Sequence, residues 1–266
     1  MNWHTILRDG ATQRGFDGGE GHPVLFQHGL GGDKAQVAEI IPSAGVRRLT
    51  LECRGQGQSQ AGNPARFTIA AFADDVLAFA DARGVARFAV GGISMGAAIA
   101  LRIAVKAPDR VAALVLVRPA WDWRTAPPNM QVFIELCGYL ETGDRDGFEA
   151  SASARRFADE APDNLASLRN FFDKPDRPAL TGLLKAIAAD GSGVTEQEVR
   201  AIAVPTLVLG NAVDLVHPLA LALDLAAMIA GSRCIELTPK ARDRQRHAHG
   251  ARAAIGEFLQ REGYRK

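Results

Sequence analysis

The chain has 266 residues, of which 47% are hydrophobic and 23% charged, a balance typical of a globular protein with a substantial core. Its formal net charge of +1 gives no electrostatic reason to expect a nucleic acid or an anionic membrane as partner. The N-terminal residues show no signal-peptide pattern, and no apolar run has the length of a membrane span. The three cysteines (53, 137 and 234) match no metal or disulfide spacing. We therefore expect a soluble cytoplasmic protein with free thiols.

Short apolar runs alternate with longer helical patterns along the chain. Several runs are continuous, which is typical of strands buried on both faces of a parallel sheet. They span residues 23–27, 48–52, 88–90, 111–117, 205–210 and 233–237. Helical patterns cover residues 70–83, 95–107 and 251–261. The alternation predicts an α/β fold with a doubly wound, mostly parallel sheet.

The first motif follows the run 23–27 directly and reads His-Gly-Leu-Gly-Gly at residues 28–32. Glycines there let the backbone turn so that amide N–H groups face a neighbouring strand end. Such amides stabilise the oxyanion that forms during acyl transfer, and the N–H groups of Leu30 and Met95 are the expected donors. A tight turn without a catalytic role is the alternative. No glycine motif of a phosphate-binding loop is present.

A Gly-x-Ser-x-Gly motif spans residues 92–96 with Ser94 at its centre. A β-rich run leads into the motif and an Ala-rich helix leaves it. This strand–turn–helix context is that of a nucleophile elbow, in which a strained serine projects its hydroxyl above the sheet. Ser94 is therefore the predicted nucleophile. The alternative is a glycine-rich connection that only contains a serine.

The alternation of strands and helices fails between residues 118 and 200, where the sequence reads as helices and loops. A helical block between two strands of a sheet is best interpreted as a lid over the carboxyl ends of the strands. The predicted organisation is a core of residues 1–117 and 201–266 and a helical lid of residues 118–200. The alternative is that this helical block is a structural insertion that has no role in binding substrate.

Three residues at the start of this block are candidates for substrate binding. Arg118, Trp121 and Trp123 come directly after a predicted strand, so they are expected near the mouth of the site. The tryptophans, with Phe133, would wall an apolar or aromatic pocket, and Arg118 would contact an anionic group of the substrate. Packing of the lid onto the core is the alternative role of the tryptophans.

Four segments together resemble the α/β-hydrolase superfamily, and more narrowly its lidded esterase, lactonase and C–C hydrolase branch. Besides residues 28–32 and 92–96, they are Glu-Cys-Arg-Gly-Gln-Gly-Gln-Ser at 52–59 and Gly-Asn-Ala-Val-Asp-Leu-Val-His-Pro at 210–218. Glu52 and Gln56 are mild departures from the family's pattern. The resemblance implies the α/β-hydrolase fold with a helical lid inserted after the sixth strand. It also implies a serine mechanism that needs no metal or organic cofactor.

The same resemblance implies that Asp214 is the acid of the catalytic triad, because its spacing from Gly210 and Pro218 is that of the family's acid loop. A carboxylate there fixes the tautomer of the catalytic imidazole and stabilises the imidazolium. The alternative is a surface aspartate that caps the helical pattern after Pro218.

The catalytic histidine departs from the family's pattern. The family places it after the last strand, which corresponds to residues 240–242, and no histidine stands there. His247, His249 and His217 remain as candidates, each with the alternative of an exposed or capping residue. His247 is the preferred general base, provided that its loop brings it within hydrogen-bond reach of the serine.

The resulting hypothesis is a serine hydrolase that cleaves a small-molecule carboxylic ester or lactone through an acyl-enzyme at Ser94, with Asp214 and His247 completing the triad. One alternative is cleavage of a C–C bond next to a ketone on the same site. The other is a non-hydrolytic ligand-binding protein that has lost the usual histidine. The sequence makes no prediction of oligomeric state.

Overall fold

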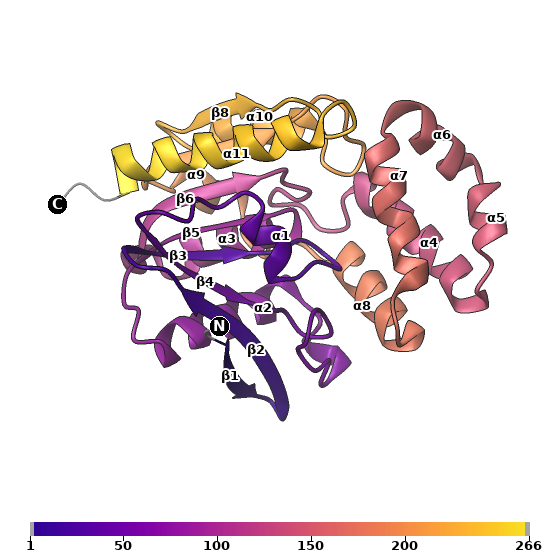
Figure 1. The fold of residues 1–266 in the computed structure, drawn as a ribbon, viewed down its shortest axis with the longest axis horizontal. Coiled ribbons are helices and arrows are strands. Elements are labelled where there is room, and N and C mark those ends of the chain that lie inside the picture. The colour runs from indigo at the N-terminus through magenta and orange to yellow at the C-terminus, as the bar shows by residue number, and fades with distance from the viewer. Residues whose placement is uncertain (1–2, 264–266) are drawn as a thin grey trace.

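A computed structural model describes residues 3–263 and contains an eight-stranded sheet in the order β1-β2-β4-β3-β5-β6-β7-β8 (Figure 1). The sheet is parallel from β4 to β8 in this order. These strands are β3 (His22–Gln27), β4 (Val46–Leu51), β5 (Phe88–Ile93), β6 (Val111–Val117), β7 (Thr206–Gly210) and β8 (Arg233–Glu236). The predicted mostly parallel sheet is confirmed.

The prediction from sequence misses an antiparallel hairpin, β1 (Trp3–Arg8) and β2 (Ala11–Gly18), that extends the sheet beyond β4. Residues of β2 alternate between buried and half-buried, as expected for a strand near the edge of a sheet. The signal that identifies the hairpin is Asp9-Gly10, whose φ angles of 48° and 76° suit a type I′ turn.

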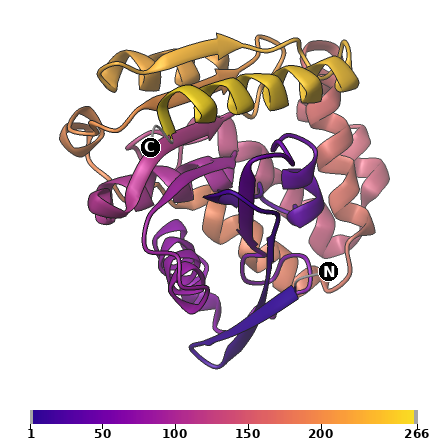
Figure 2. The ribbon, with the colours of Figure 1, turned by 60° about the vertical axis from the view of Figure 1, so that its left-hand side comes forward.

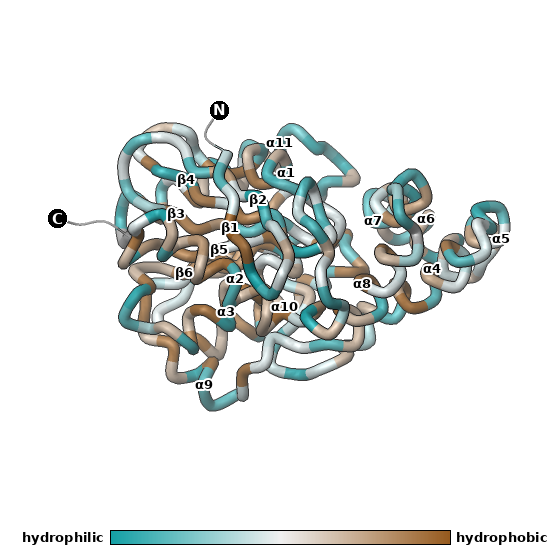
Figure 3. The backbone as a smooth tube through the Cα atoms, turned by 90° about the horizontal axis from the view of Figure 1, so that it is seen from below, coloured by the Kyte–Doolittle hydropathy of each residue, from teal (hydrophilic) through white to brown (hydrophobic). Residues whose placement is uncertain are grey.

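Helices cover both faces of the sheet, which explains the continuous apolar strands (Figures 1 and 2). On β3, Val24 and Phe26 belong to one buried cluster and Leu25 to the other. Figure 3 shows hydrophobic residues gathered along the central strands β3, β5 and β6. The first face carries α1 (Lys34–Ala38) and α11 (Arg244–Phe258), and the second carries α2 (Ile69–Ala82), α3 (Met95–Lys106) and α10 (Leu219–Met228).

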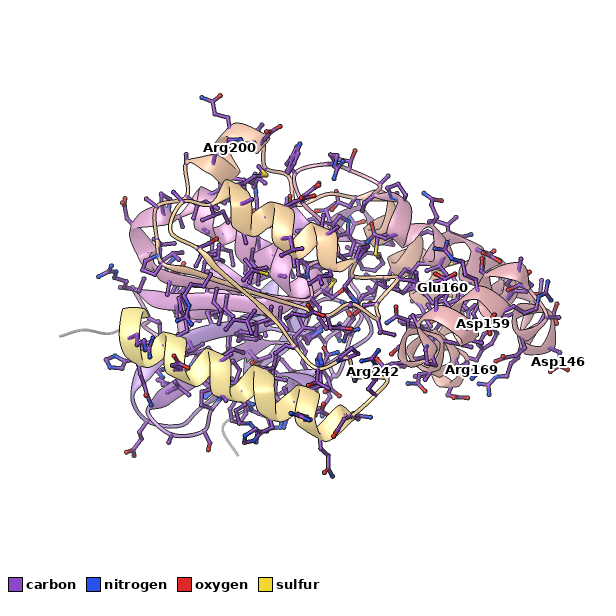
Figure 4. All side chains as sticks on the ribbon, turned by 90° about the horizontal axis from the view of Figure 1, so that it is seen from above. Asp146, Asp159, Glu160, Arg169, Arg200 and Arg242 are labelled. Carbon is purple, nitrogen blue, oxygen red and sulfur yellow. The ribbon has the colours of Figure 1, made fainter. Side chains whose placement is uncertain are left out.

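Between β6 and β7 the chain leaves the sheet and forms a separate group of helices at one end of the molecule (Figure 1). This group, which we call the insertion, contains α4 (Gln131–Thr142), α5 (Arg145–Glu149), α6 (Ala152–Glu160), α7 (Pro162–Arg169) and α8 (Arg177–Ala189). The next helix, α9 (Glu196–Arg200), instead contacts α3 and α10 of the core. Figure 4 shows Arg200 on the core side, far from Asp146, Asp159, Glu160 and Arg169 of the insertion. The insertion is therefore shorter than the predicted lid, whose role stays a prediction.

Short helical turns complete the described chain. They are the 3₁₀ segments η1 (Pro64–Arg66), η2 (Pro108–Arg110), η3 (Pro128–Met130) and η4 (Asn170–Asp173) and the π-helical segment η5 (Leu259–Gly263). Within residues 3–263, none of the helices has both the length and the apolar character needed to cross a membrane.

A buried ion pair fastens the loop after β4 to α2. The side chains of Arg54 and Asp75 are 0% and 1% exposed. Arg54 donates from Nε to Oδ2 of Asp75 at 2.6 Å and from Nη2 to Oδ1 at 3.0 Å. The same Nη2 donates to Asp9, in the hairpin turn, at 3.0 Å. One guanidinium therefore holds the hairpin, the loop and α2 together.

Replacing Asp75 by Asn is expected to lower the free energy of unfolding by about 3–5 kcal/mol, because the buried charge of Arg54 then loses its buried counterion and keeps only the more exposed Asp9. Urea unfolding followed by circular dichroism measures the change. Asp81→Asn on the same helix is the matched control. Asp81 pairs with Arg110 at 2.8 Å but is 63% exposed, so its loss should change stability by less than about 1 kcal/mol. Equal small effects would contradict the structural role of the buried pair.

Candidate active site

Ser94 joins β5 to α3 with φ and ψ angles of 56° and −114°, a conformation that residues other than glycine rarely adopt. The turn needs glycine on both sides. A Cβ on Gly92 would lie 2.2 Å from the carbonyl carbon of Gly96, and one on Gly96 would lie 2.3 Å from the carbonyl oxygen of Gln27. The Ser94 hydroxyl has no hydrogen-bond partner within residues 3–263. The turn thus holds a strained serine with a free hydroxyl.

The turn at residues 28–32 lies beside this serine, since a Cβ on Gly29 would be 3.4 Å from Ser94 Cβ. His28 anchors the turn. Its Nε2 accepts from the Cys53 N–H at 3.0 Å, and its Nδ1–H donates to the Gly29 carbonyl at 2.8 Å. Burial lowers the pKa of His28 and outweighs the hydrogen bond to Gly29, so the ring is neutral and keeps this pattern.

Two amides beside Ser94 are unoccupied. The N–H groups of the glycines that flank Leu30 donate to Oε1 of Gln36 and of Gln56, at 2.7 Å each. The N–H groups of Leu30 and Met95 have no acceptor in the described part of the chain. These are the two amides that the sequence led us to expect as oxyanion donors.

Asp214, in the loop after β7, is a buried carboxylate with four hydrogen bonds. Its Oδ2 accepts from Nε of Arg118 at 2.7 Å and from Nδ2 of Asn211 at 3.3 Å. Its Oδ1 accepts from the backbone N–H of His217 at 2.9 Å and from the ring Nδ1–H at 2.8 Å. Burial pushes the pKa of Asp214 upward, but the charges and hydrogen bonds of Arg118 and His217 outweigh it and hold the pKa below its usual range. Asp214 is therefore ionised.

His217 is the histidine that Asp214 orients. Its Nδ1–H points to the carboxylate, and its Nε2 has no hydrogen-bond partner in the described chain. Burial lowers the pKa of His217, and although Asp214 raises it, the charges of Arg118 and Lys240 contribute to a net value below the usual 6.5. The ring is therefore neutral at pH 7 and carries its lone pair on Nε2.

The expected pairing of Asp214 with His247 is not found. His247 lies in the first turn of α11, where its Nδ1–H donates to the Thr238 carbonyl at 2.9 Å. His249 is exposed on the same helix. Sequence reasoning preferred His247 and kept His217 only as one of the other candidates. The backbone N–H of His217 bonds to Asp214 and closes a tight turn, which brings the ring back to the same oxygen.

A cleft of about 510 Å³ lies at the carboxyl ends of the strands. Ser94, Arg118 and His217 line it from the core. Phe133 of α4 and Phe171 of η4 line it from the insertion, with ring centroids 6.0 Å apart in an edge-to-face arrangement. The cleft thus has polar groups on the side of the sheet and an aromatic wall opposite.

The expected positions of Trp121 and Trp123 are wrong, because neither residue lines this cleft. Trp121 is 1% exposed and donates its indole N–H to the Asp190 carbonyl at 3.2 Å. Trp123 stacks under the guanidinium of Arg124, 5.2 Å from the ring centroid. Phe171, which does line the cleft, carried no sequence signal that distinguishes a cleft wall from a core phenylalanine.

The insertion is fastened to the loop that carries the acid. Asn164 of α7 accepts from the N–H groups of Leu215 and Val216 at 2.8 and 3.1 Å. Asn129 of η3 donates to the Val216 carbonyl at 2.7 Å. Asp163 of α7 also forms an ion pair with Lys240, in the loop after β8, at 3.3 Å. That loop carries Arg242 and faces the insertion in Figure 4. The insertion therefore fixes the position of the loop 211–217.

The family model, two relatives and a solved structure that resemble this chain all carry the name of a hydrolase or of the hydrolase fold. The family model described as the alpha/beta hydrolase fold matches residues 22–237. A protein of Klebsiella pneumoniae (strain 342), provisionally named carbamate hydrolase RutD, is 31% identical over 229 residues, which cover 80% of this chain and 82% of the relative. The 2-hydroxymuconate semialdehyde hydrolase of Pseudomonas putida is 26% identical over 245 residues, covering 86% and 83%. The solved enol-lactonase from Burkholderia xenovorans LB400 has a TM-score of 0.73 at 24% identity, covering 97% of this chain and 100% of its own.

Replacing Ser94 by Gly is expected to give a more stable protein than replacing it by Ala, because glycine adopts this backbone conformation without steric strain. The expected difference is about 1–3 kcal/mol, measured by thermal or urea unfolding of the two variants. Gly138 in α4 is the control, since a Cβ there has no neighbour within 4 Å. At that position the order should reverse, with Ala more stable by about 0.5–1 kcal/mol. Equal stability of the Ser94→Ala and Ser94→Gly proteins would argue against strain at the turn.

Proposed function

The chain belongs to the α/β-hydrolase fold family, and we propose that it is a serine hydrolase of carboxylic esters or lactones. The observation that carries the proposal is a cleft lined by the strained Ser94, which has a free hydroxyl, and by His217, which the buried Asp214 orients. The unoccupied amides of Leu30 and Met95 lie beside the serine. In the proposed assignment, Ser94 is the nucleophile, His217 the general base and Asp214 its orienting acid. The amides of Leu30 and Met95 form the oxyanion hole.

The first half of the reaction acylates the serine. Ser94 Oγ attacks the carbonyl carbon of the ester while Nε2 of His217 takes the hydroxyl proton. The ionised Asp214 stabilises the imidazolium that results. The negative charge on the former carbonyl oxygen is held by the two free amides, each of which is worth on the order of 3 kcal/mol in the transition state.

The second half releases the product. The C–O bond to the leaving group breaks, and the imidazolium gives its proton to the leaving oxygen. Water then attacks the acyl-enzyme with His217 again as base, which yields the carboxylic acid and restores the Ser94 hydroxyl. The insertion serves as a lid in this proposal. Its aromatic wall excludes water and strengthens the electrostatic interactions beneath it.

His217 replaces His247 as the proposed base for a geometric reason. A general base has to reach the nucleophile and have its other nitrogen fixed. The ring of His217 lines the cleft with Ser94 and is fixed by Asp214, whereas Nδ1 of His247 is bound to a backbone carbonyl away from the acid. The loop after β8 brings Lys240, not a histidine, to the cleft.

A second candidate is hydrolysis of a carbamate, because the relative at 31% identity carries a name for that activity. The chemistry uses the same serine, amides and base, and differs only in the nitrogen bonded to the carbonyl. Cleavage of a C–C bond next to a ketone is a third candidate on the same groups, suggested by the name of the Pseudomonas putida relative. A panel of matched nitrophenyl esters, nitrophenyl carbamates and a vinylogous diketone separates the three.

Replacing Ser94 by Ala is expected to abolish hydrolysis of short p-nitrophenyl esters, since the acyl-enzyme then has no oxygen to form on. A fluorophosphonate probe should label the wild-type protein at Ser94, detected by mass spectrometry of the peptide, and should leave the variant unlabelled. Undiminished turnover by the Ala variant would remove Ser94 from the mechanism. An unlabelled wild-type protein without esterase activity would favour the ligand-binding alternative.

Replacing His217 by Gln is expected to reduce kcat/KM by a factor on the order of 10²–10⁴, the usual contribution of a general base. His247→Gln is the matched control and should keep a value close to that of the wild type. Because the base works only when neutral and its pKa is lowered, wild-type kcat/KM should fall at acid pH with a midpoint below 6.5. Loss of activity in the His247 variant alone would return the role of base to that residue.

A further inference from the structure

Arg118 occupies the position next to Ser94 at the carboxyl ends of the strands. Ile93 and Val117 are paired in the register of β5 and β6, so the residues that follow them lie at equivalent ends of neighbouring strands, about 5 Å apart. Like Ser94, Arg118 has a positive φ angle, 48°. Its N–H donates to the Leu209 carbonyl of β7 at 2.6 Å. An unfavourable backbone conformation is thus imposed on a large side chain that points into the cleft.

The guanidinium of Arg118 is only partly used by the protein. Its Nε donates to Asp214, and its two terminal nitrogens have no hydrogen-bond partner in the described chain. The side chain is 10% exposed and lines the cleft beside the serine. Neither terminal nitrogen is among the fully buried polar atoms, so both are reachable from the cleft. A planar pair of charged donors matches the two oxygens of a carboxylate.

The remaining charges of the cleft favour an anion at this place. Among the described residues, four basic and three acidic side chains line the cleft. Arg244 is paired with Glu39 at 3.1 Å and Lys240 with Asp163 at 3.3 Å. Asp163 and Glu39 are therefore balanced by their own partners. Arg118 is paired only with Asp214 among the described acidic residues, and that pair engages Nε and leaves the two terminal nitrogens unpaired.

We propose that the substrates of this protein carry a carboxylate close to the scissile carbonyl and that the terminal nitrogens of Arg118 bind it. The inference rests on the proposed hydrolase function, which it restricts to anionic esters. Such an ester has its carboxylate either on the acyl part or on the alcohol part, and both forms present the same group to Arg118.

Two pairs of isosteric esters test the inference. Monomethyl succinate and methyl succinamate differ by a carboxylate or an amide on the acyl part, and acetoxyacetate and acetoxyacetamide differ likewise on the alcohol part. Rates follow from released methanol or acetate. For at least one pair, wild-type kcat/KM is expected to favour the anion by about 10- to 100-fold, the range of a charge-assisted hydrogen-bonding pair. The pair that shows the preference identifies the side of the ester that carries the carboxylate.

Variants assign the preference to Arg118. Arg118→Gln should remove it and Arg118→Lys should retain part of it. The readout is the ratio of kcat/KM for the anionic ester to kcat/KM for its neutral partner, because a disturbed Asp214 slows both members of a pair alike. Arg244→Gln removes a paired cation from the same cleft and should leave the ratio within about twofold, as expected for an exposed ion pair. An unchanged ratio in the Gln variant would overturn the inference.

Calorimetric titration of Ser94→Ala with the four esters separates this inference from the proposed function, since it measures binding without turnover. Tighter binding of an anionic ester supports the carboxylate site even if no ester is hydrolysed. Equal binding of anionic and neutral members in both pairs overturns it, even if the wild-type protein hydrolyses them. This measurement needs no change at Arg118 and so does not depend on the stability of its variants.

Discussion

The carboxyl ends of the central strands are organised around one buried carboxylate. The side chain of Asp214 is 0% exposed, so its charge has to be balanced within the protein. Arg118 balances it from the end of β6, and the neutral His217 donates to it from the loop that carries Asp214, each by a hydrogen bond of 2.8 Å or less. Both partners also line the cleft, so the residues that make the buried charge tolerable are residues of the proposed substrate site.

Two of the strained backbone positions lie at these same carboxyl ends of the strands. Five residues other than glycine have a positive φ angle in the described chain, and two of them, Ser94 and Arg118, stand side by side after β5 and β6. Parallel strands buried on both faces provide a rigid base that holds such turns in place. The consequence of the two strained turns is that both side chains are presented to the cleft in a fixed direction.

Local patterns in the sequence predicted the sheet and the serine turn because both depend on neighbouring residues. Continuous apolar runs identified β6 with its observed bounds, and the flanking glycines identified Ser94. The orienting histidine was not predictable in this way, since the backbone path between Asp214 and His217 decides where the ring points. The same holds for Trp121, which is buried through a contact with Asp190, 69 residues away. Long-range packing decides which residues line the cleft and which are buried in the core, and no local sequence pattern records that packing.

Asp214 and His217 belong to a single turn, so their separation is set by the backbone of four residues and not by the packing of two elements. A pair assembled from separate loops drifts apart when either loop shifts. Here Asn129 and Asn164 of the segment between β6 and β7 hold the same turn at its centre. The insertion is therefore bonded to acid and histidine as one unit, and not to either residue alone. The hydrogen bond between acid and histidine thus depends on the local backbone of one turn and not on how the insertion packs on the core.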